Sequence, residues 1–165
     1  MSLQLTLQTN GVGATVALGR AIGGVLQADD VVALVGPLGV GKTYFTKGIA
    51  LGLDIADDIV TSPTFVLQQH YAGKSALYHF DAYRLSGPAE LESIGFAETC
   101  RRGGVVVVEW ADRVADAIPA DALWIELTAL DALRRRLSLH TICQSLGQRL
   151  GAAGLDQFAA AADKT

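Results

Sequence analysis

The stretch that decides the fold is Val31-Val32-Ala33-Leu34-Val35-Gly36-Pro37-Leu38-Gly39-Val40-Gly41-Lys42-Thr43. Its first five residues form a continuous apolar run, which is typical of a central strand covered on both faces. The last eight match the pattern G-x-x-x-x-G-K-S/T, a loop that cradles phosphate groups. A helix is predicted over residues 42–53, directly after the loop. A strand, a glycine-rich loop and a helix in this order indicate an α/β fold.

The composition predicts one folded domain over residues 1–165. Half of the 165 residues are hydrophobic (50%) and only 18% are charged, which excludes intrinsic disorder. The formal net charge of −4 argues against stand-alone binding to nucleic acid, because contacts to phosphates need a basic surface. The only two cysteines, Cys100 and Cys143, are too few for a disulfide framework, so we expect reduced, buried thiols.

Targeting signals are not apparent in the sequence. The first residues lack the basic and apolar regions of a signal peptide, and no apolar run reaches the ~18 residues of a membrane span. We therefore expect a cytoplasmic protein without a membrane segment.

The rest of the chain alternates strands with helices. Strands are predicted at 3–7, 65–71, 76–80, 105–108, 123–127 and 137–141, and helices at 15–26, 88–96 and about 145–162, before a frayed tail. This pattern predicts a three-layer fold like that of P-loop NTPases, with a mostly parallel or mixed central sheet and helices on both faces.

The loop from Gly36 to Thr43 has a function for each required residue. Its glycines let backbone N–H groups turn toward phosphate oxygens, and the helix after it directs its positive dipole end at the same anion. Lys42 reaches the β- and γ-phosphates, and the Thr43 hydroxyl ligates Mg²⁺. The loop, with Pro37, Leu38 and Val40 included, therefore predicts a nucleoside triphosphate with Mg²⁺, without indicating the base.

Two acidic residues follow apolar strands. Glu109 comes after 105–108, and Asp81 comes after 76–80. Ligands bind at the carboxyl ends of parallel strands, so Glu109 is predicted to hold Mg²⁺, directly or through water. Asp81 is predicted to orient the attacking water or to share the metal. The alternatives are an acid at a helix start for Glu109 and a cap or turn residue for Asp81.

Four other features have two interpretations each. Trp110 either packs in the core or lies beside the nucleotide. The loop 61–64 is either a plain turn or a sensor of the γ-phosphate. One arginine of the run 134–136 reaches the nucleotide or a partner, or all three lie on a solvated face. His79 is interpreted as a strand residue, because no metal-ligand partner stands at useful spacing.

Several classes of nucleotide-binding protein fit less well. A Ras-type GTPase needs Asn-Lys-x-Asp for guanine, and the only asparagine of this chain is Asn10. A small-molecule kinase usually has an arginine-bearing lid, for which only Arg101-Arg102 is comparable. A small P-loop ATPase fits better, and a phosphotransferase and a non-catalytic, nucleotide-gated interaction module are the alternatives.

The order of the motifs resembles the TsaE (YjeE) family over about residues 10–140. After the phosphate loop come Ser62-Pro63-Thr64-Phe65, His79-Phe80-Asp81-Ala82-Tyr83-Arg84-Leu85 and Glu109-Trp110-Ala111-Asp112-Arg113. The phosphate loop alone is shared by many families, whereas the series of four blocks is specific. Three residues depart from the usual pattern, namely Pro37, Tyr44 and Ala111.

The resemblance implies a bacterial ATPase that is needed for threonylcarbamoyladenosine beside the anticodon of tRNA. It implies ATP and Mg²⁺ as cofactors, and TsaD and TsaB as protein partners whose complex is reset between turnovers. Contact with tRNA would come only through that complex, and the oligomeric state of the chain itself stays open. By the same resemblance, Lys42 and the glycines hold phosphates, Thr43 and Glu109 hold Mg²⁺, and Asp81 serves in hydrolysis. Trp110, Arg113 and Arg134 are carried over to the nucleotide site.

Overall fold

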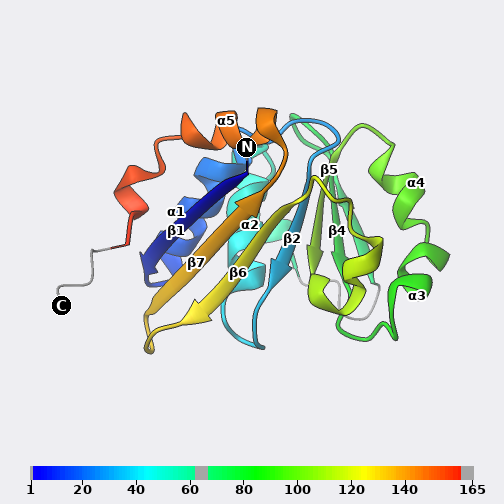
Figure 1. Cartoon of the computed structure of the whole chain (residues 1–165), viewed down its shortest axis with the longest axis horizontal. Coiled ribbons are helices and arrows are strands. Elements are labelled where there is room, and N and C mark those ends of the chain that lie inside the picture. Colours follow the sequence, from blue (N-terminus) through cyan, green and yellow to red (C-terminus); the bar gives the residue numbers. More distant parts are fainter. Residues whose placement is uncertain (1, 62–66, 161–165) are drawn as a thin grey trace.

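The structure is a computed structural model that describes residues 2–61 and 67–160. These residues build a seven-stranded sheet in the order β1-β7-β6-β2-β5-β4-β3 (Figure 1). The strands are β1 (Leu3–Asn10), β2 (Val31–Val35), β3 (Gln68–Tyr71), β4 (Leu77–Asp81), β5 (Val105–Glu109), β6 (Leu123–Ala129) and β7 (Arg134–Thr141). The helices are α1 (Val12–Gly23), α2 (Lys42–Gly52), α3 (Pro88–Ser93), α4 (Phe96–Cys100) and α5 (Gln144–Gly151), with the 3-10 helices η1 (Asp57–Ile59), η2 (Ala111–Ala117) and η3 (Leu155–Phe158).

The sheet is mixed, and the predicted fold class is confirmed. The central strands β6, β2, β5 and β4 run parallel to one another. The outer strands pair antiparallel, β3 with β4 and β7 with both β6 and β1. The strands β2, β4 and β5 are almost fully buried, as the apolar runs at 31–35 and 105–108 predicted for β2 and β5.

Helices lie on both faces of the sheet, and the face under α3, α4 and η2 is covered only in part. The helices α1 and α2 pack over a core that includes Leu18, Phe45 and Ile49, all fully buried. The opposite core, under α3, α4 and η2, includes Phe80 and Phe96. On that second side β1, β7 and β6 have no helix in front of them among the described residues (Figure 1).

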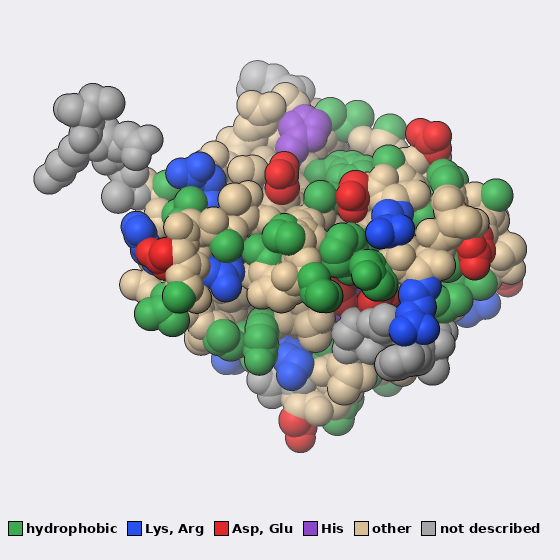
Figure 2. All heavy atoms as spheres, turned by 90° about the horizontal axis from the view of Figure 1, so that it is seen from below, with side chains coloured by type: hydrophobic (Ala, Val, Ile, Leu, Met, Phe, Trp, Pro, Cys, Tyr) green, Lys and Arg blue, Asp and Glu red, His purple; other side chains and the backbone are tan. Residues whose placement is uncertain are grey.

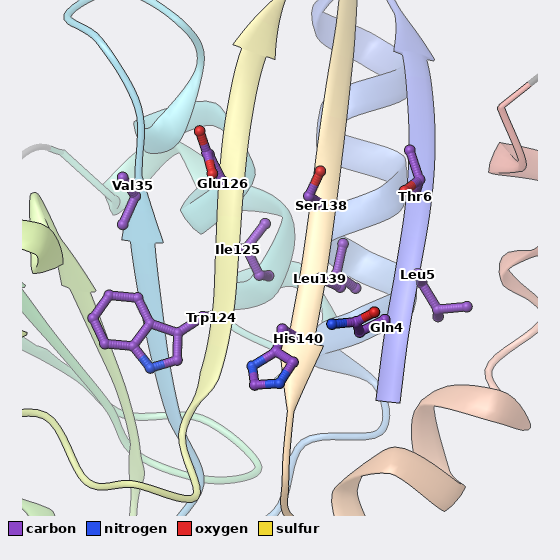
Figure 3. Close-up of a pocket in the computed structure, with 10 residues that line it drawn as sticks. All are labelled: Gln4, Leu5, Thr6, Val35, Trp124, Ile125, Glu126, Ser138, Leu139 and His140. Carbon is purple, nitrogen blue, oxygen red and sulfur yellow. The ribbon is translucent and has the colours of Figure 1, made fainter. Parts of the chain in front are cut away.

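The uncovered part of the sheet is a polar, shallow surface. A hollow of about 540 Å³ lies on it. Figure 3 shows Gln4, Glu126, Ser138 and His140 along β1, β6 and β7, with the indole of Trp124 on the side toward β2. The period of two along β6 and β7 puts their leucines into the core and these side chains on the open side.

Three predicted helix boundaries are corrected by glycine positions. The first helix spans Val12–Gly23 instead of 15–26. The predicted helix 88–96 ends at Ser93, and α4 starts after Gly95, which has φ +85°. The predicted terminal helix 145–162 is likewise interrupted, since α5 ends at Gly151 and η3 starts after Gly154, with φ +70°. A left-handed backbone at glycine is the usual way for a helix to stop.

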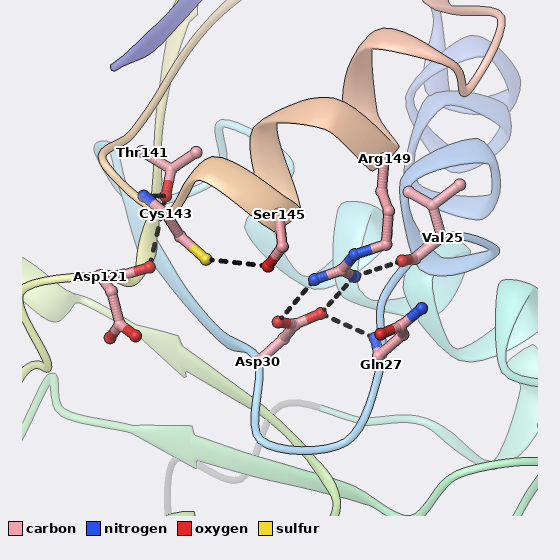
Figure 4. Close-up of polar contacts among 8 residues, drawn as sticks. All are labelled: Val25, Gln27, Asp30, Asp121, Thr141, Cys143, Ser145 and Arg149. Carbon is pink, nitrogen blue, oxygen red and sulfur yellow. Dashed lines mark hydrogen bonds and ion pairs between the residues drawn. The ribbon is translucent and has the colours of Figure 1, made fainter. Parts of the chain in front are cut away.

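The last helix is fixed to the loop before β2 by a charged contact (Figure 4). The guanidinium of Arg149 donates to the Asp30 carboxylate at 2.8 and 3.1 Å and to the carbonyl of Val25 at 2.5 Å. The Asp30 carboxylate also accepts from the backbone N–H of Gln27 at 2.7 Å. These contacts join α1, β2 and α5 at the end of the sheet opposite the phosphate loop.

Both cysteines are free, as expected, although each is only partly buried. Burial raises the pKa of the Cys100 thiol to about 11, which keeps it protonated at neutral pH. None of the helices in residues 2–61 and 67–160 has the length and apolar character needed to cross a bilayer.

The contact between α1 and α2 depends on glycine. Gly19 and Gly23 of α1 face Gly48 and Gly52 of α2, and the backbones approach so closely that a Cβ on Gly48 would overlap the Val16 carbonyl and the Cα of Gly19. This close approach seats α2, and with it the start of the phosphate loop helix, against the sheet.

Gly48→Ala should therefore destabilise the fold by about 3 kcal/mol, as overpacking of a rigid core does. We expect the thermal midpoint to fall by about 10 °C for a chain of this size, measured by circular dichroism. The matched control is Gly147→Ala in α5, where a Cβ would meet only the side chain of Leu3 at an ordinary 3.5 Å. Equal midpoints for the two variants would contradict the close packing of α1 and α2.

Candidate nucleotide-binding site

The phosphate loop connects the carboxyl end of β2 to the first turn of α2. Gly36, Gly39 and Gly41 have φ angles of 157°, 77° and 115°, a range that other residues rarely adopt. The helix begins at Lys42, directly after Gly41, so its free N–H groups and positive dipole end adjoin the loop. The predicted strand, loop and helix are therefore present in the order that anion binding requires.

Lys42 lies inside the curve of the loop. Its Nζ donates to the carbonyl of Gly36 at 2.5 Å and to that of Pro37 at 2.9 Å, and it lies 4.0 Å from the ring centre of Trp110. The side chain is 5% exposed, and burial lowers the pKa of Lys42 while the carboxylates of Glu109 and Asp81 oppose that shift. A cation is thus held beside the loop in a partly desolvated place, where its attraction for an anion is strong.

Thr43, Glu109 and His79 form a chain of polar contacts. The Thr43 hydroxyl donates to Oε1 of Glu109 at 3.2 Å, and Oε2 of Glu109 lies 2.5 Å from Nε2 of His79. Glu109 is 3% exposed and His79 is fully buried. The alternative of a plain acid at a helix start does not describe Glu109, because its carboxylate lies between the loop helix and β4.

Asp81 lies next to Glu109 at the same edge of the sheet. The two residues are register partners in the parallel pair β4–β5. Asp81 is buried, and its Oδ1 accepts a hydrogen bond from the backbone N–H of Tyr83 at 2.8 Å. Both predicted acids therefore lie together at the carboxyl ends of parallel strands, as expected. Asp81 also makes a hydrogen bond within the turn after β4, which was the alternative role predicted for it.

Two hollows flank the loop. One of about 210 Å³ is lined by Leu38, Gly39, Gly41, Lys42, Thr43, Tyr44, Asp81, Tyr83, Glu109 and Trp110. A second of about 80 Å³ lies on the other side of Val40 and Gly41, between the start of α1 and the β6–β7 hairpin. Figure 2 views this end of the molecule, where hydrophobic side chains gather at the surface. The first hollow brings together the phosphate loop and both acids.

Trp110 borders the first hollow in an unusual backbone conformation. Its φ of 59° is left-handed, which a bulky residue adopts only where the surroundings hold it. The indole packs against Tyr83, with 4.9 Å between the ring centres. The guanidinium carbon of Arg113 lies over the indole ring at 5.7 Å. Trp110 therefore has a packing role and borders the hollow, while its place beside a nucleotide stays a prediction.

The arginine that touches the loop is Arg135, not the predicted Arg134. Arg135 donates through Nε to the carbonyl of Val40 at 2.8 Å. Arg134 instead pairs with Asp131 at 2.6 Å within the hairpin turn, and its side chain is 49% exposed. The hairpin thus supplies one cation to the loop, while a role of Arg134 in nucleotide binding stays a prediction.

The predicted sensor loop lies partly outside the described residues, and the prediction for His79 did not include a contact that the structure shows. Residues 62–64 of the predicted sensor loop 61–64 lie outside the described residues, as do residues 65 and 66 of the predicted strand 65–71, of which the structure shows β3. His79 was interpreted as a strand residue, whereas its ring contacts Glu109. The spacing shows only that residues 79 and 81 share a face of one strand, and it does not indicate Glu109 as the partner.

The sheet and the loop define an α/β protein of the P-loop NTPase-like fold class. The family model for "Threonylcarbamoyl adenosine biosynthesis protein TsaE" matches residues 9–137. This chain belongs to the TsaE family, a family of threonylcarbamoyladenosine biosynthesis, as the four ordered motifs predicted.

Relatives and a solved structure agree with this membership. The chain is 42% identical over 125 residues to the tRNA threonylcarbamoyladenosine biosynthesis protein TsaE of Treponema pallidum, which covers 76% of this chain and 92% of that protein. The TsaE protein of Bacillus subtilis is 39% identical over 123 residues, 74% of this chain and 76% of that one. The crystal structure of YdiB from Bacillus subtilis superposes with a TM-score of 0.77 and 30% identity, over 92% of this chain and 97% of that chain.

Proposed function

We propose that this chain binds ATP with Mg²⁺ and hydrolyses it to support threonylcarbamoyladenosine modification of tRNA. The observation that carries the proposal is the convergence of Lys42, Thr43, Asp81 and Glu109 on the single hollow beside the phosphate loop. Lys42 and Thr43 stand in the first turn of α2, and Asp81 and Glu109 end β4 and β5. Together they provide a cation, a hydroxyl and two carboxylates.

The protein groups present fit a bound Mg²⁺. No group of three or more His, Cys, Asp or Glu side chains that could hold a metal ion occurs within residues 2–61 and 67–160. Mg²⁺ usually takes one or two protein oxygens and completes its shell with water and phosphate oxygens. The Thr43 hydroxyl and the Glu109 carboxylate, 3.2 Å apart, are such a pair. When bound there, Mg²⁺ would neutralise charge on the phosphate oxygens.

The side chains divide the work of hydrolysis by position. The loop and Lys42 hold the phosphates, with Lys42 exchanging its carbonyl contacts for phosphate oxygens. Thr43 and Glu109 hold the metal. Asp81, beside Glu109, accepts a hydrogen bond from the attacking water and so fixes the direction of attack.

The proposed partners are the TsaD and TsaB proteins, and the proposed place of action is the cytoplasm. The net charge of −4 supports contact with tRNA through a protein complex rather than directly. In this proposal the chain uses ATP to reset the TsaD–TsaB complex between turnovers.

The test is a pull-down of this chain with TsaD–TsaB, with and without ATP, combined with a phosphate-release assay of the assembled complex. ATP-dependent capture together with phosphate release is the expected result. Capture without phosphate release would mean that the chain is a nucleotide-gated interaction module and not an ATPase. A phosphorylated small-molecule acceptor in place of free phosphate would instead identify a phosphotransferase.

Arg135→Ala should weaken ATP binding by about tenfold, since a hydrogen bond from a charged donor contributes about 1.5–3 kcal/mol. The physical reason is the loss of the Arg135 contact to the Val40 carbonyl, which steadies the loop. Arg136→Ala is the matched control, because the same charge is removed one residue away, from an exposed side chain. Isothermal titration of both variants measures the difference, and equal affinities would refute a separate role for Arg135.

A further inference from the structure

His79 is a fully buried histidine that the proposed chemistry leaves without a task. It stands in the middle of β4, in register with Val107 of β5 and Gln69 of β3. Along β4 it shares a face with Leu77 and Asp81, and the leucine is also fully buried. An imidazole in such a place costs free energy unless a polar contact compensates for its burial.

The compensating contact is with Glu109. Nε2 of His79 lies 2.5 Å from Oε2 of the carboxylate, while Nδ1 has no hydrogen-bond partner in the described part of the chain. A carboxylate that binds a metal ion is ionised and can only accept, so the role proposed below requires the tautomer with the proton on Nε2. A leucine would fill the same space without leaving a buried nitrogen unpaired, so packing alone does not account for histidine here.

The contact fixes which oxygen of Glu109 faces the loop helix. With Oε2 held by His79, Oε1 is directed at the hydroxyl of Thr43. Carboxylates that bind metals are themselves held by hydrogen bonds, and removing such an outer contact typically costs about 10–100-fold in metal affinity or activity.

We propose that His79 is a positioning residue that orients the Glu109 carboxylate so that Oε1 and the Thr43 hydroxyl present a preformed pair of oxygen ligands to Mg²⁺. This inference rests on the proposed function, since it assumes that Thr43 and Glu109 hold the metal. It assigns to β4 a second contribution to the site, in addition to Asp81.

The test compares His79→Leu with His79→Gln. Leucine removes the donor and keeps the volume, whereas the amide N–H of glutamine reaches about as far as Nε2. We expect His79→Leu to raise the Mg²⁺ concentration for half-maximal ATP binding by about 10–100-fold, measured by isothermal titration. Affinity in EDTA should stay within about twofold of wild type, and His79→Gln should recover most of the Mg²⁺ dependence.

Folding is controlled with His79→Asn. Asparagine is as polar as glutamine but too short to reach Glu109. If the leucine variant does not fold, the Mg²⁺ requirement of His79→Asn is compared with that of His79→Gln to test the positioning role. An unchanged Mg²⁺ requirement in the variants without the contact would overturn the inference. An equal loss of affinity in EDTA and in Mg²⁺ would also overturn it, because that result indicates general damage.

The wild-type chain separates this inference from the proposed function. If the wild type binds no ATP, or binds it equally with and without Mg²⁺, the proposed function fails. If the wild type shows the Mg²⁺ effect and the His79 variants retain it, only the positioning role fails.

Discussion

Lys42→Ala should weaken ATP binding by at least about a hundredfold, because two or more charge-assisted hydrogen bonds of about 1.5–3 kcal/mol each are lost. The ammonium group lies within the loop, at hydrogen-bond distance from the carbonyls of Gly36 and Pro37. In that position it needs only to exchange these carbonyls for phosphate oxygens. Isothermal titration with ATP measures the loss directly.

The fold should tolerate this substitution. Burial lowers the pKa of Lys42, so the buried ammonium carries a desolvation cost that alanine removes. We therefore expect the thermal midpoint of Lys42→Ala to stay within a few degrees of wild type. Loss of binding with the fold retained would attribute the effect to the ammonium group itself.

Lys47→Ala is the matched control for charge. Lys47 belongs to the same helix, and its ammonium lies 5.5 Å from the ring centre of Tyr44 rather than in the loop. Its removal changes the net charge equally and should leave ATP affinity within about threefold, because this half-buried charge lies outside the loop and is screened by salt. Similar ATP affinities for Lys42→Ala and the wild type would contradict the assignment of this loop as the phosphate-binding loop.

The fold and most of the site follow from local sequence patterns. The apolar run before Gly36 predicted a buried strand, and the two runs that end at Asp81 and Glu109 predicted strands parallel to it. Since parallel strands bring their carboxyl ends to one edge of the sheet, the two acids were expected beside the loop, and the structure places them there as register partners. No knowledge of tertiary contacts was needed for that step.

Contacts that depend on strand register could not be predicted in the same way. The run 134–136 contains three arginines, and its sequence does not indicate which one turns toward the loop. The pairing of β7 with β6 and β1 decides it, since Arg135 stands opposite Ala129 and Thr9 while its neighbours on both sides are exposed. A shift by one residue would have exchanged the faces.

The contact between His79 and Glu109 has a similar origin. The two residues are 30 positions apart, and their side chains meet because β4 and β5 are adjacent and in a fixed register. A histidine within an apolar strand has no local signal that names its partner. The interpretation as a strand residue was therefore correct for its backbone and incomplete for its side chain.

Glu109→Gln should reduce ATP hydrolysis by at least about a hundredfold, equivalent to about 2.7 kcal/mol of lost transition-state stabilisation. Glutamine has nearly the same shape, so its carbonyl oxygen can still accept from the Thr43 hydroxyl. The negative charge that binds Mg²⁺ is lost, however, and the Mg²⁺ requirement should rise. Phosphate release by the assembled complex, measured across a range of Mg²⁺ concentrations, tests both effects.

Comparison variants separate the two acids and the general effect of charge. Glu126→Gln removes a carboxylate from the exposed side of β6 and should leave hydrolysis unchanged. Asp81→Asn should lower the turnover rate without raising the Mg²⁺ requirement if Asp81 orients water, and should change both if it shares the metal. ATP affinity in EDTA should be near wild type for Glu109→Gln, because Lys42 and the loop are intact. Wild-type hydrolysis by both Glu109→Gln and Asp81→Asn would mean that neither carboxylate acts on the phosphates.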